Sequence, residues 1–357
     1  MRETHEEMKY PAMPVRPAKD PNIETLRGLA ILLVVAGHVI GIDATGGMKV
    51  ADDSLWRYLY ASLQYVRMPL FTAISGWVYA LHPVAAHEAG TFMFKKARRL
   101  LLPMICVGTL YFLIQYITPG TNRTGELAEI WKIYLLPYTV YWYLPALFLI
   151  FGAVAALDVH GACTTLRRWG MWLLIACAGV LIEPQLSSRL PNVFSIWGAL
   201  CLLPFFLLGV GIRRFRAELA TPAMRRLYFA GFLAGLLVQQ LVWFSAGNSH
   251  VLRAWFLHLP IGIVASAFLL TLKWENRLLI RLGSYAYGIY LFHAFGTSGG
   301  RILLTHAGIH SQTAIFLLSM CLGIGIPILV EIVLRRFPLL STLFLGRKMP
   351  RRSIRKG

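Results

Sequence analysis

Arg27 and His38 are the two residues of this sequence whose types and spacing best fit a chemical role. If one α-helix carries both, the eleven steps between them turn through about 1100° and rise about 16 Å, so the side chains share a face at different depths. A guanidinium binds phosphate oxygens through paired hydrogen bonds, and an imidazole acts as a general base. The pair therefore suits a donor such as a coenzyme A thioester, with phosphates at one end and a reactive carbonyl at the other. A structural alternative stays open, in which Arg27 reaches the water boundary and His38 bonds a neighbouring helix.

The element that positions this pair is one of a series of long apolar segments. Of 357 residues, 57% are hydrophobic and 14% charged, whereas a soluble domain is roughly 45–50% apolar and about 25% charged. A helix needs roughly 20 apolar residues to cross a bilayer. Ten windows of about this length are residues 26–45, 58–81, 100–117, 140–157, 169–183, 194–212, 227–245, 255–272, 284–305 and 313–334. We therefore expect an all-α polytopic membrane protein with about ten transmembrane helices, one transmembrane domain over residues 23–336, and His38 near the middle of the bilayer.

The basic residues predict the orientation of this domain. Alternate loops and the two tails hold 26 Lys and Arg, and the opposite loops hold seven. Positive loops stay in the cytoplasm, so we expect both termini to be cytoplasmic. Residues 1–22 are then a disordered cytoplasmic tail, and residues 337–357 are a basic cytoplasmic tail. Membrane orientation accounts for the net charge of +19, and no nucleic-acid partner is expected.

Two further candidates lie in the second segment. Arg67 comes two residues before Pro69, which interrupts the helical hydrogen bonding beside a charged group. Ionisable residues within a membrane are costly and usually functional, so Arg67 is a candidate for substrate binding. Ser75 is a weaker candidate, because the hydroxyl has no evident base and a serine next to a glycine commonly serves helix packing.

The ninth segment carries a polar stripe, with Ser284, Tyr287, Tyr290 and His293 at intervals of three residues. This pattern is expected if the helix face lines a cavity. It is equally expected if the face packs against a neighbouring helix through hydrogen bonds. Tyr290 and His293 are the substrate-binding candidates if the stripe faces a cavity.

Other polar residues are expected to have structural roles. His258 stands alone before Pro260. Asp43 follows His38 by five residues, about 140° away on a helix, and the spacing is taken as coincidence. A weaker hypothesis is that Gly41 unwinds the helix and lets Asp43 orient His38. The five cysteines lack C-x-x-C spacing, so neither a disulfide framework nor a metal site is expected.

Several of these segments together resemble the acyltransferase 3 family of membrane proteins. The opening run Leu26 to His38 contains the hallmark of an Arg or Lys, ten residues and a His. Other matching segments follow in order: Arg67-Met68-Pro69-Leu70-Phe71, Ile74-Ser75-Gly76, Lys95 to Arg99 before Pro103, Trp142-Tyr143-Leu144, and Ser284 to His293. The resemblance spans roughly residues 22–335.

The resemblance implies an O-acyltransferase of the bacterial cytoplasmic (inner) membrane. Members move an acyl group, usually acetyl and sometimes succinyl, from cytoplasmic acyl-CoA to a hydroxyl of a cell-surface or exported carbohydrate, beside proteins of polysaccharide biosynthesis. Carried over by position, His38 is the catalytic residue and Arg27 binds the donor with Arg98 and Arg99. No metal is implied.

Alternatives stay open at this point. His38 could act as general base on the acceptor hydroxyl, or could take the acyl group covalently and pass it on. A flippase or transporter of lipid-linked glycan is a different function, although the sequence lacks a visible internal repeat and has few carboxylates within the segments. A non-catalytic scaffold would leave the shared face of Arg27 and His38 unexplained.

Overall fold

The computed structural model describes residues 20–122, 126–246 and 255–349, and every regular element in these ranges is helical. Ten of the helices contain between 17 and 30 residues. They are α1 (Pro21–Ile40), α2 (Leu55–Tyr79), α3 (Ala89–Ile117), α5 (Tyr143–Val159), α6 (Leu166–Ser187), α7 (Ile196–Arg214), α9 (Pro222–Ala246), α11 (Trp255–Thr271), α12 (Arg277–His306) and α13 (Gln312–Leu334). The shorter helices are α4 (Lys132–Leu135), α8 (Arg216–Leu219) and α14 (Pro338–Leu345), with single turns at Ala86–Glu88, Leu127–Glu129 and Val193–Ser195.

The all-α membrane class predicted from the sequence is confirmed. Each of the ten predicted segments overlaps one of the ten long helices, and six of these are long and apolar enough to cross a membrane. The number of crossings and the side on which the termini lie stay predictions. Residues 1–19 and 350–357 of the two predicted tails lie outside the described residues.

Local signals fix both ends of α1. The Asp20 carboxylate accepts hydrogen bonds from the backbone N–H groups of Asn22 and Ile23, and Pro21 occupies the first helical position. The helix ends at Gly41, whose φ of 87° suits a residue without a side chain. The predicted segment 26–45 is therefore too long at its end, and His38 lies in the last turn of α1.

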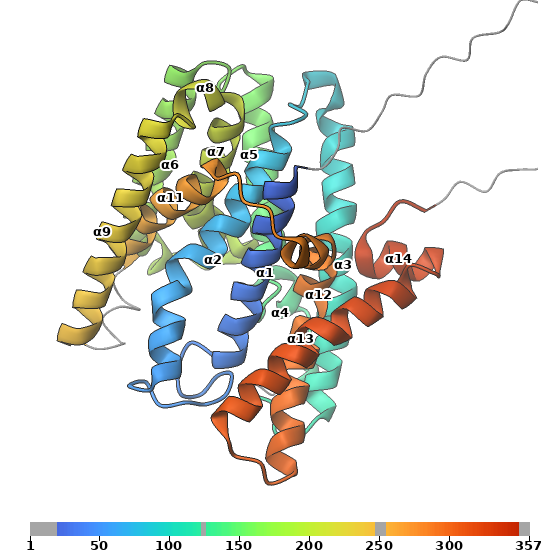
Figure 1. Ribbon diagram of the computed structural model, residues 1–357. Helices are drawn as coiled ribbons and strands as arrows, with labels where there is room; N and C mark the ends of the chain where they lie inside the picture. The colour runs from blue at the N-terminus through green and yellow to red at the C-terminus, as the bar shows by residue number, and fades with distance from the viewer. Residues whose placement is uncertain (1–19, 123–125, 247–254, 350–357) are drawn as a thin grey trace, which may run out of the picture.

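Helix α1 lies inside the bundle, packed against α2 and α12, while α9 and α14 lie at its edges (Figure 1). Glycines permit the contact between α1 and α12. A Cβ added to Gly28 would lie 2.1 Å from the carbonyl oxygen of Leu279, and one added to Gly283 would lie 2.2 Å from that of Glu24. Close approach through small residues is a usual way to pack helices in membranes.

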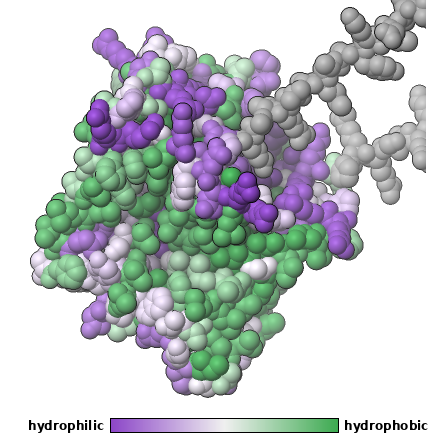
Figure 2. Space-filling view, in the orientation of Figure 1, coloured by the Kyte–Doolittle hydropathy of each residue, from purple (hydrophilic) through white to green (hydrophobic). Residues whose placement is uncertain are grey.

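The outer surface of the bundle is largely apolar. Helix α9 exposes Leu237 and Phe244, α6 exposes Leu174, and α13 exposes Leu329, each more than 60% accessible. Figure 2 shows hydrophobic side chains over a broad middle region, with hydrophilic side chains gathered towards the end that contains α8. Such an apolar surface fits contact with lipid chains rather than water.

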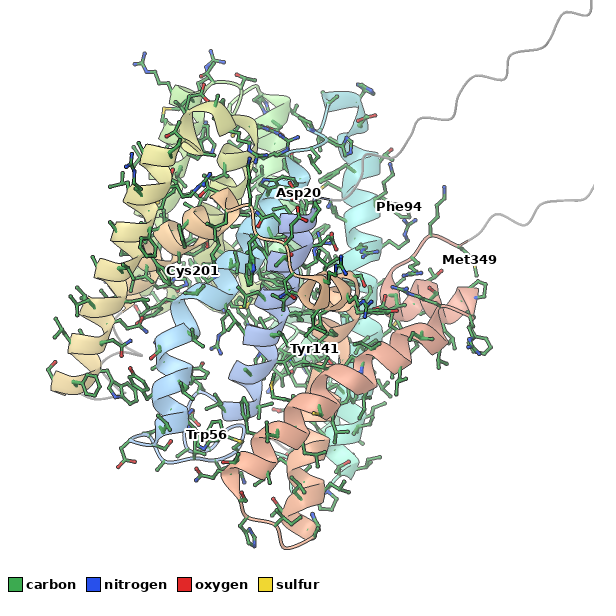
Figure 3. The ribbon with its side chains drawn as sticks, viewed as in Figure 1. Asp20, Trp56, Phe94, Tyr141, Cys201 and Met349 are labelled. Atoms are coloured by element: carbon green, nitrogen blue, oxygen red, sulfur yellow. The ribbon has the colours of Figure 1, made fainter. Side chains whose placement is uncertain are left out.

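The bundle has two chemically different ends. We call the end at which α1 begins and α2 finishes the basic end, since Lys95 to Arg99 and the arginines closing α7 and α13 lie there. In Figure 3, Asp20 marks this end, Trp56 lies at the opposite end, and Tyr141 lies in the interior between them. The positive loops predict that the basic end faces the cytoplasm.

Candidate active site

A large cavity opens among the helix ends at the basic end. It has a volume of about 820 Å³ and adjoins a second cavity of about 400 Å³, with Arg27, Ser75 and Arg99 lining both. Their walls come from α1, α2, α3, α5, α12 and the end of α13. These volumes lie within the range of roughly 300–1,000 Å³ that is usual for small-molecule sites. We refer to the two together as the basic cavity.

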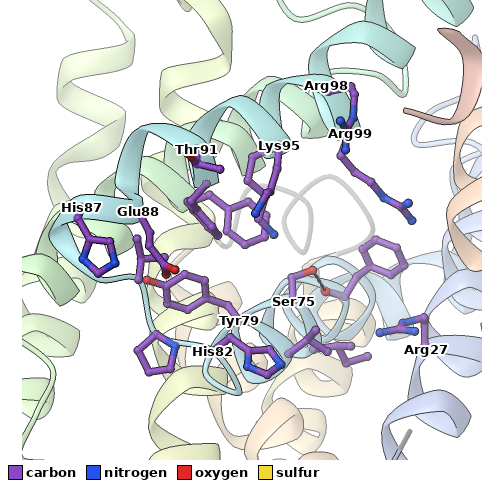
Figure 4. Close-up of a pocket in the computed structure, with 18 residues that line it drawn as sticks. Arg27, Ser75, Tyr79, His82, His87, Glu88, Thr91, Lys95, Arg98 and Arg99 are labelled. Carbon is purple, nitrogen blue, oxygen red and sulfur yellow. Dashed lines mark hydrogen bonds between the residues drawn. The ribbon is translucent and has the colours of Figure 1, made fainter. Parts of the chain in front are cut away.

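Cations outnumber carboxylates on the walls of the basic cavity. The lining Lys and Arg residues are Arg27, Lys95, Lys96, Arg98, Arg99, Arg335 and Arg347, and the lining acids are Glu88 and Glu331. Figure 4 shows Arg27 and Arg99 on opposite sides of the cavity, with Ser75 lying to one side of both. The excess of positive charge favours a ligand that carries several negative charges.

Neighbouring groups hold the cations in place. The Arg27 guanidinium donates to the Glu24 carboxylate at 2.6 Å, and its side chain remains 26% exposed. The Arg99 guanidinium lies 4.6 Å from the centre of the Tyr287 ring, and the Lys96 ammonium lies 3.5 Å from that of Phe151. Stacking on an aromatic face orients a cation and leaves its outward N–H groups available to a ligand.

Aromatic rings form the inner wall of the basic cavity. Tyr143 and Tyr290 lie with ring centroids 5.7 Å apart, and Phe71 lies 6.2 Å from Tyr290. The Tyr290 hydroxyl donates to the Val140 carbonyl, which fixes this ring in the wall. Ser75 faces the cavity, but its hydroxyl donates to the Phe71 carbonyl at 3.1 Å in the preceding turn. Ser75 therefore has the geometry of a helix hydroxyl bonded to its own backbone.

Two histidines meet deeper in the bundle. The rings of His38 on α1 and His293 on α12 lie with centroids 5.0 Å apart. Nδ1 of His293 lies 2.8 Å from the Tyr290 carbonyl oxygen and 3.1 Å from that of Ile289. Since carbonyl oxygens only accept, Nδ1 carries the proton and Nε2 has a free lone pair in the neutral ring. Nε2 of His293 is buried and has no hydrogen-bond partner in the described part of the chain.

Arg67 lies beside this histidine pair. Its Nη2 donates to the Tyr60 hydroxyl at 2.5 Å, and its guanidinium lies 4.3 Å from the Tyr60 ring centre. A Cβ added to Gly37 would lie 1.6 Å from Nη1 of Arg67, so the glycine makes room for the guanidinium. A positive charge is thereby held next to the residue that precedes His38.

A smaller cavity, of about 130 Å³, lies on the other side of His38. Its walls include His38, Tyr111, Thr297, Ser298 and Arg301, together with Gly47 from the loop that follows α1. His38 is exposed although it contacts the buried His293, because its imidazole faces this cavity. The imidazole is therefore reached from the end opposite to the basic cavity.

The predicted site residues thus form two groups. Arg27, Arg98, Arg99, Ser75 and Tyr290 line the basic cavity, while His38, His293 and Arg67 form the deeper cluster. Arg27 lines the basic cavity, whereas His38 lines the smaller cavity. A row of rings joins the groups, since Tyr290 lies 6.1 Å from His293 and His293 lies 5.0 Å from His38.

The polar stripe of the ninth predicted segment lies on α12 and supplies part of this row of rings. Ser284, Tyr287 and Tyr290 line the basic cavity, and His293 continues the stripe to His38. The hydroxyls of Tyr287 and Tyr290 also donate to the carbonyls of Arg99 and Val140, so the stripe has features of both a cavity wall and a hydrogen-bonded packing seam. Lys96, Glu331, Arg335 and Arg347 also line the cavity but were not predicted. For Lys96 a signal existed, because it lies within the basic run that ends at Arg99.

The weaker hypothesis for Asp43 is wrong. Its Oδ1 accepts hydrogen bonds from the backbone and hydroxyl of Thr45 and from the Gly46 N–H, which closes a turn after α1. The hydrogen bond from the Thr45 hydroxyl is the main cause that lowers the pKa of Asp43. Asp43 is therefore committed to its own loop. His258 packs between aromatic rings, 5.1 Å from Phe205 and 6.0 Å from Tyr65, as a structural residue would.

All five cysteines are free thiols. Within the described ranges, no three His, Cys, Asp or Glu side chains gather closely enough to hold a metal ion.

The fold and the site together define a helical membrane protein. It has a basic cavity at one end and a histidine pair beyond that cavity. The chain matches the acyltransferase domain of the acyltransferase 3 family over residues 20–332, and it belongs to that family. It is a membrane acyltransferase. No curated protein and no solved structure matches the chain.

Proposed function

We propose that the protein transfers an acyl group, acetyl or succinyl, from cytoplasmic acyl-CoA to a carbohydrate hydroxyl in the bacterial inner membrane. The observation that carries this proposal is the position of His38. Its imidazole faces a small cavity at one end of the bundle, while aromatic rings connect it to a basic cavity at the other. Donor and acceptor could then approach one imidazole from opposite sides.

The basic cavity suits the donor. Phosphate oxygens of coenzyme A would meet Arg27, Arg98 and Arg99, which line it together with Lys95 and Lys96. Guanidinium groups bind phosphate through paired, charge-assisted hydrogen bonds. The pantetheine arm would pass along the wall of Phe71, Tyr143 and Tyr290 and carry the thioester towards His293 and His38.

The small cavity suits the reacting part of the acceptor. Its volume of about 130 Å³ admits the hydroxyl and the atoms next to it, so the remainder of a carbohydrate would stay outside. Thr297, Ser298 and Tyr111 offer hydroxyls that can exchange hydrogen bonds with sugar hydroxyls. A glycan attached to lipid or to a growing polysaccharide could present one hydroxyl in this way.

The proposed reaction needs one base and one anion-stabilising group. His38 removes the proton of the acceptor hydroxyl as its oxygen attacks the thioester carbonyl, and Arg67 stabilises the negative charge on the carbonyl oxygen. The carbon–sulfur bond then breaks, and the departing thiolate takes the proton from the His38 imidazolium. The products are an acyl ester of the acceptor and free coenzyme A. We assign His293 the role of a positioning residue, because its Nε2 lone pair is unpaired in the described part of the chain and would be available to accept an N–H from the adjacent His38 ring during the reaction.

Transfer through an acyl-imidazole of His38 is the second form of this mechanism. In that form the acceptor displaces the acyl group from His38 after coenzyme A has left. Trapping of an acylated His38 peptide by rapid quench and mass spectrometry distinguishes the two forms.

Binding of acyl-CoA to the purified protein tests the proposed donor. Titration calorimetry in detergent is expected to show saturable binding of acetyl-CoA or succinyl-CoA, and mass spectrometry of surface glycans is expected to show loss of an acyl ester when the gene is deleted. A protein that binds neither thioester, or a deletion that leaves glycan acylation unchanged, would contradict the proposal. A flippase is expected to fail the binding test and to alter the amount of exported glycan instead.

A further inference from the structure

We propose that Arg335 and Arg347 form a phosphate-binding pair for the nucleotide end of acyl-CoA. Both line the part of the basic cavity that also reaches Tyr290. Both lie beyond residue 332, where the match to the family ends. This inference rests on the proposed function and extends it, because it assigns donor binding to a segment outside the family's common domain.

The chain holds Arg347 at the cavity through a tight contact after α14. Helix α14 packs against α3, and Gly346 then adopts a φ of 62°, which favours glycine. A Cβ added to Gly346 would lie 2.5 Å from the Arg98 carbonyl oxygen and 2.6 Å from the Arg99 Cα. The next backbone N–H, from Arg347, donates to the Ser341 carbonyl at 3.2 Å. The segment therefore docks on the basic run of α3 and delivers one more guanidinium to the cavity.

Glu331 brings the two guanidinium groups together. Its Oε1 lies 2.5 Å from Nη2 of Arg335 and 3.5 Å from Nη2 of Arg347. The carboxylate is 7% exposed, whereas the side chains of Arg335 and Arg347 are 35% and 40% exposed. One carboxylate thus orients two guanidinium groups that stay partly exposed.

The charge of this pair is only half compensated. Two guanidinium groups share one carboxylate, and Arg99 lines the same cavity. Burial, followed by the charge of Arg335, lowers the pKa of Arg347 from its ordinary value, while Glu331 opposes that change. An arginine stays charged in proteins, so a bound dianion would reduce the electrostatic repulsion between these guanidinium groups.

The placement of aromatic rings suits the same ligand. The Arg335 guanidinium lies 5.1 Å from the Tyr285 ring centre, and that of Arg99 lies 4.6 Å from Tyr287. From this pair the cavity wall continues through Tyr287 to Tyr290, the ring next to His293. A donor with its phosphates at Arg335 and Arg347 would therefore have its thioester arm directed at the histidine pair.

The affinities of two donors for two variants test this inference. Acetyl-CoA carries the phosphates, whereas S-acetylpantetheine carries the same thioester arm without them. Arg347→Ala is expected to weaken acetyl-CoA binding about tenfold or more, the usual effect of one lost charge-assisted hydrogen bond, and to leave S-acetylpantetheine binding unchanged. Lys348→Ala is the matched control, because Lys348 is exposed, carries the same charge and is the next residue. Arg347→Lys is expected to fall between wild type and Arg347→Ala.

Three results would overturn the inference. These are unchanged acetyl-CoA affinity in Arg347→Ala, an equal loss for both donors, and an equal loss of acetyl-CoA affinity in Lys348→Ala. An equal loss for both donors would indicate a structural role for the docked segment. Each of these results leaves wild-type acyl-CoA binding intact, so failure of this inference is distinguishable from failure of the proposed function.

Discussion

At the scale of single residues, the orphaned nitrogen of His293 is the least expected feature. Two backbone carbonyls hold Nδ1, and Nε2 is buried beside the ring of His38 with no partner among the described residues. A buried nitrogen without a partner costs free energy, so it needs a functional explanation. In the proposed mechanism, this nitrogen orients the His38 imidazole.

His293→Leu is expected to lower the turnover number about tenfold, the factor that corresponds to one neutral hydrogen bond, with little change in acyl-CoA affinity. His293→Gln, which can place an acceptor near the position of Nε2, is expected to retain more turnover than His293→Leu. The measurements are kcat and donor Kd for each folded variant. If both substitutions weakened donor binding and left kcat intact, His293 would belong to the binding site.

Arg27 is expected to act in donor binding. Glu24 orients its guanidinium towards the basic cavity, and the residue does not line the cavity that His38 faces. Arg27→Ala is expected to weaken acyl-CoA binding by about tenfold or more, and Arg27→Lys by less, because Lys keeps the charge but loses the paired donors. Titration calorimetry gives the donor affinity, with Arg226→Ala as a control arginine on α9. Unchanged affinity together with lower turnover would move Arg27 to the chemical step.

At the scale of elements, the site depends on the contact between α1 and α12. These helices carry His38 and His293, and they approach closely only because Gly28 and Gly283 have no side chains. A wider spacing would separate the two rings.

Gly28→Ala tests this dependence. The added methyl group would meet the Leu279 carbonyl at 2.1 Å, and overpacking of this kind costs about 1–3 kcal/mol. We expect a lower unfolding temperature and reduced acyl transfer. Gly170→Ala in α6 is the control, because an added Cβ there meets nothing within 4 Å, and alanine favours helix. Equal unfolding temperatures for the two variants would show that the contact tolerates a side chain.

The elements also show how far the sequence allowed prediction. The apolar segments predicted the long helices correctly. A run of about 20 apolar residues bounded by polar loops indicates a membrane helix without any knowledge of distant contacts. The helical repeat predicted that Arg27 and His38 share one face of a helix. The same repeat predicted the polar stripe that ends at His293. The position at which α1 ends was missed, although Gly41 was present as a signal.

Contacts between distant segments could not be predicted in this way. Arg67 reaches the neighbourhood of His38 only because Gly37 leaves space for it, and that pairing joins two helices. Arg347 reaches the basic cavity because α14 docks on α3, whereas the sequence indicated a basic tail from residue 337. Such placements depend on the packing of the whole bundle.

At the scale of the whole molecule, the orientation in the membrane decides from which side each substrate arrives. The proposed donor cavity lies at the end that carries most of the basic residues, and the positive loops predict that this end is cytoplasmic. The small cavity beside His38 would then face the opposite side, where exported carbohydrate is found.

Thiol labelling in intact cells tests this orientation. In a background without native cysteines, Thr45→Cys in the loop after α1 is expected to react with an impermeant reagent, and Arg216→Cys in α8 is expected to react only after permeabilisation. Both positions are described, and they lie at opposite ends of the bundle. Labelling of position 216 in intact cells would reverse the orientation and would place the donor cavity on the wrong side.

The central claim is that His38 performs the chemistry at the meeting point of two cavities. The most direct measurement is transfer of radiolabelled acetyl or succinyl from its CoA thioester to the glycan fraction of membranes that contain either wild-type protein or His38→Ala. We predict that His38→Ala lowers transfer by about 10²-fold or more, the usual contribution of a general base, while acyl-CoA affinity and the unfolding temperature stay at wild-type values. Wild-type transfer by folded His38→Ala protein would contradict the account.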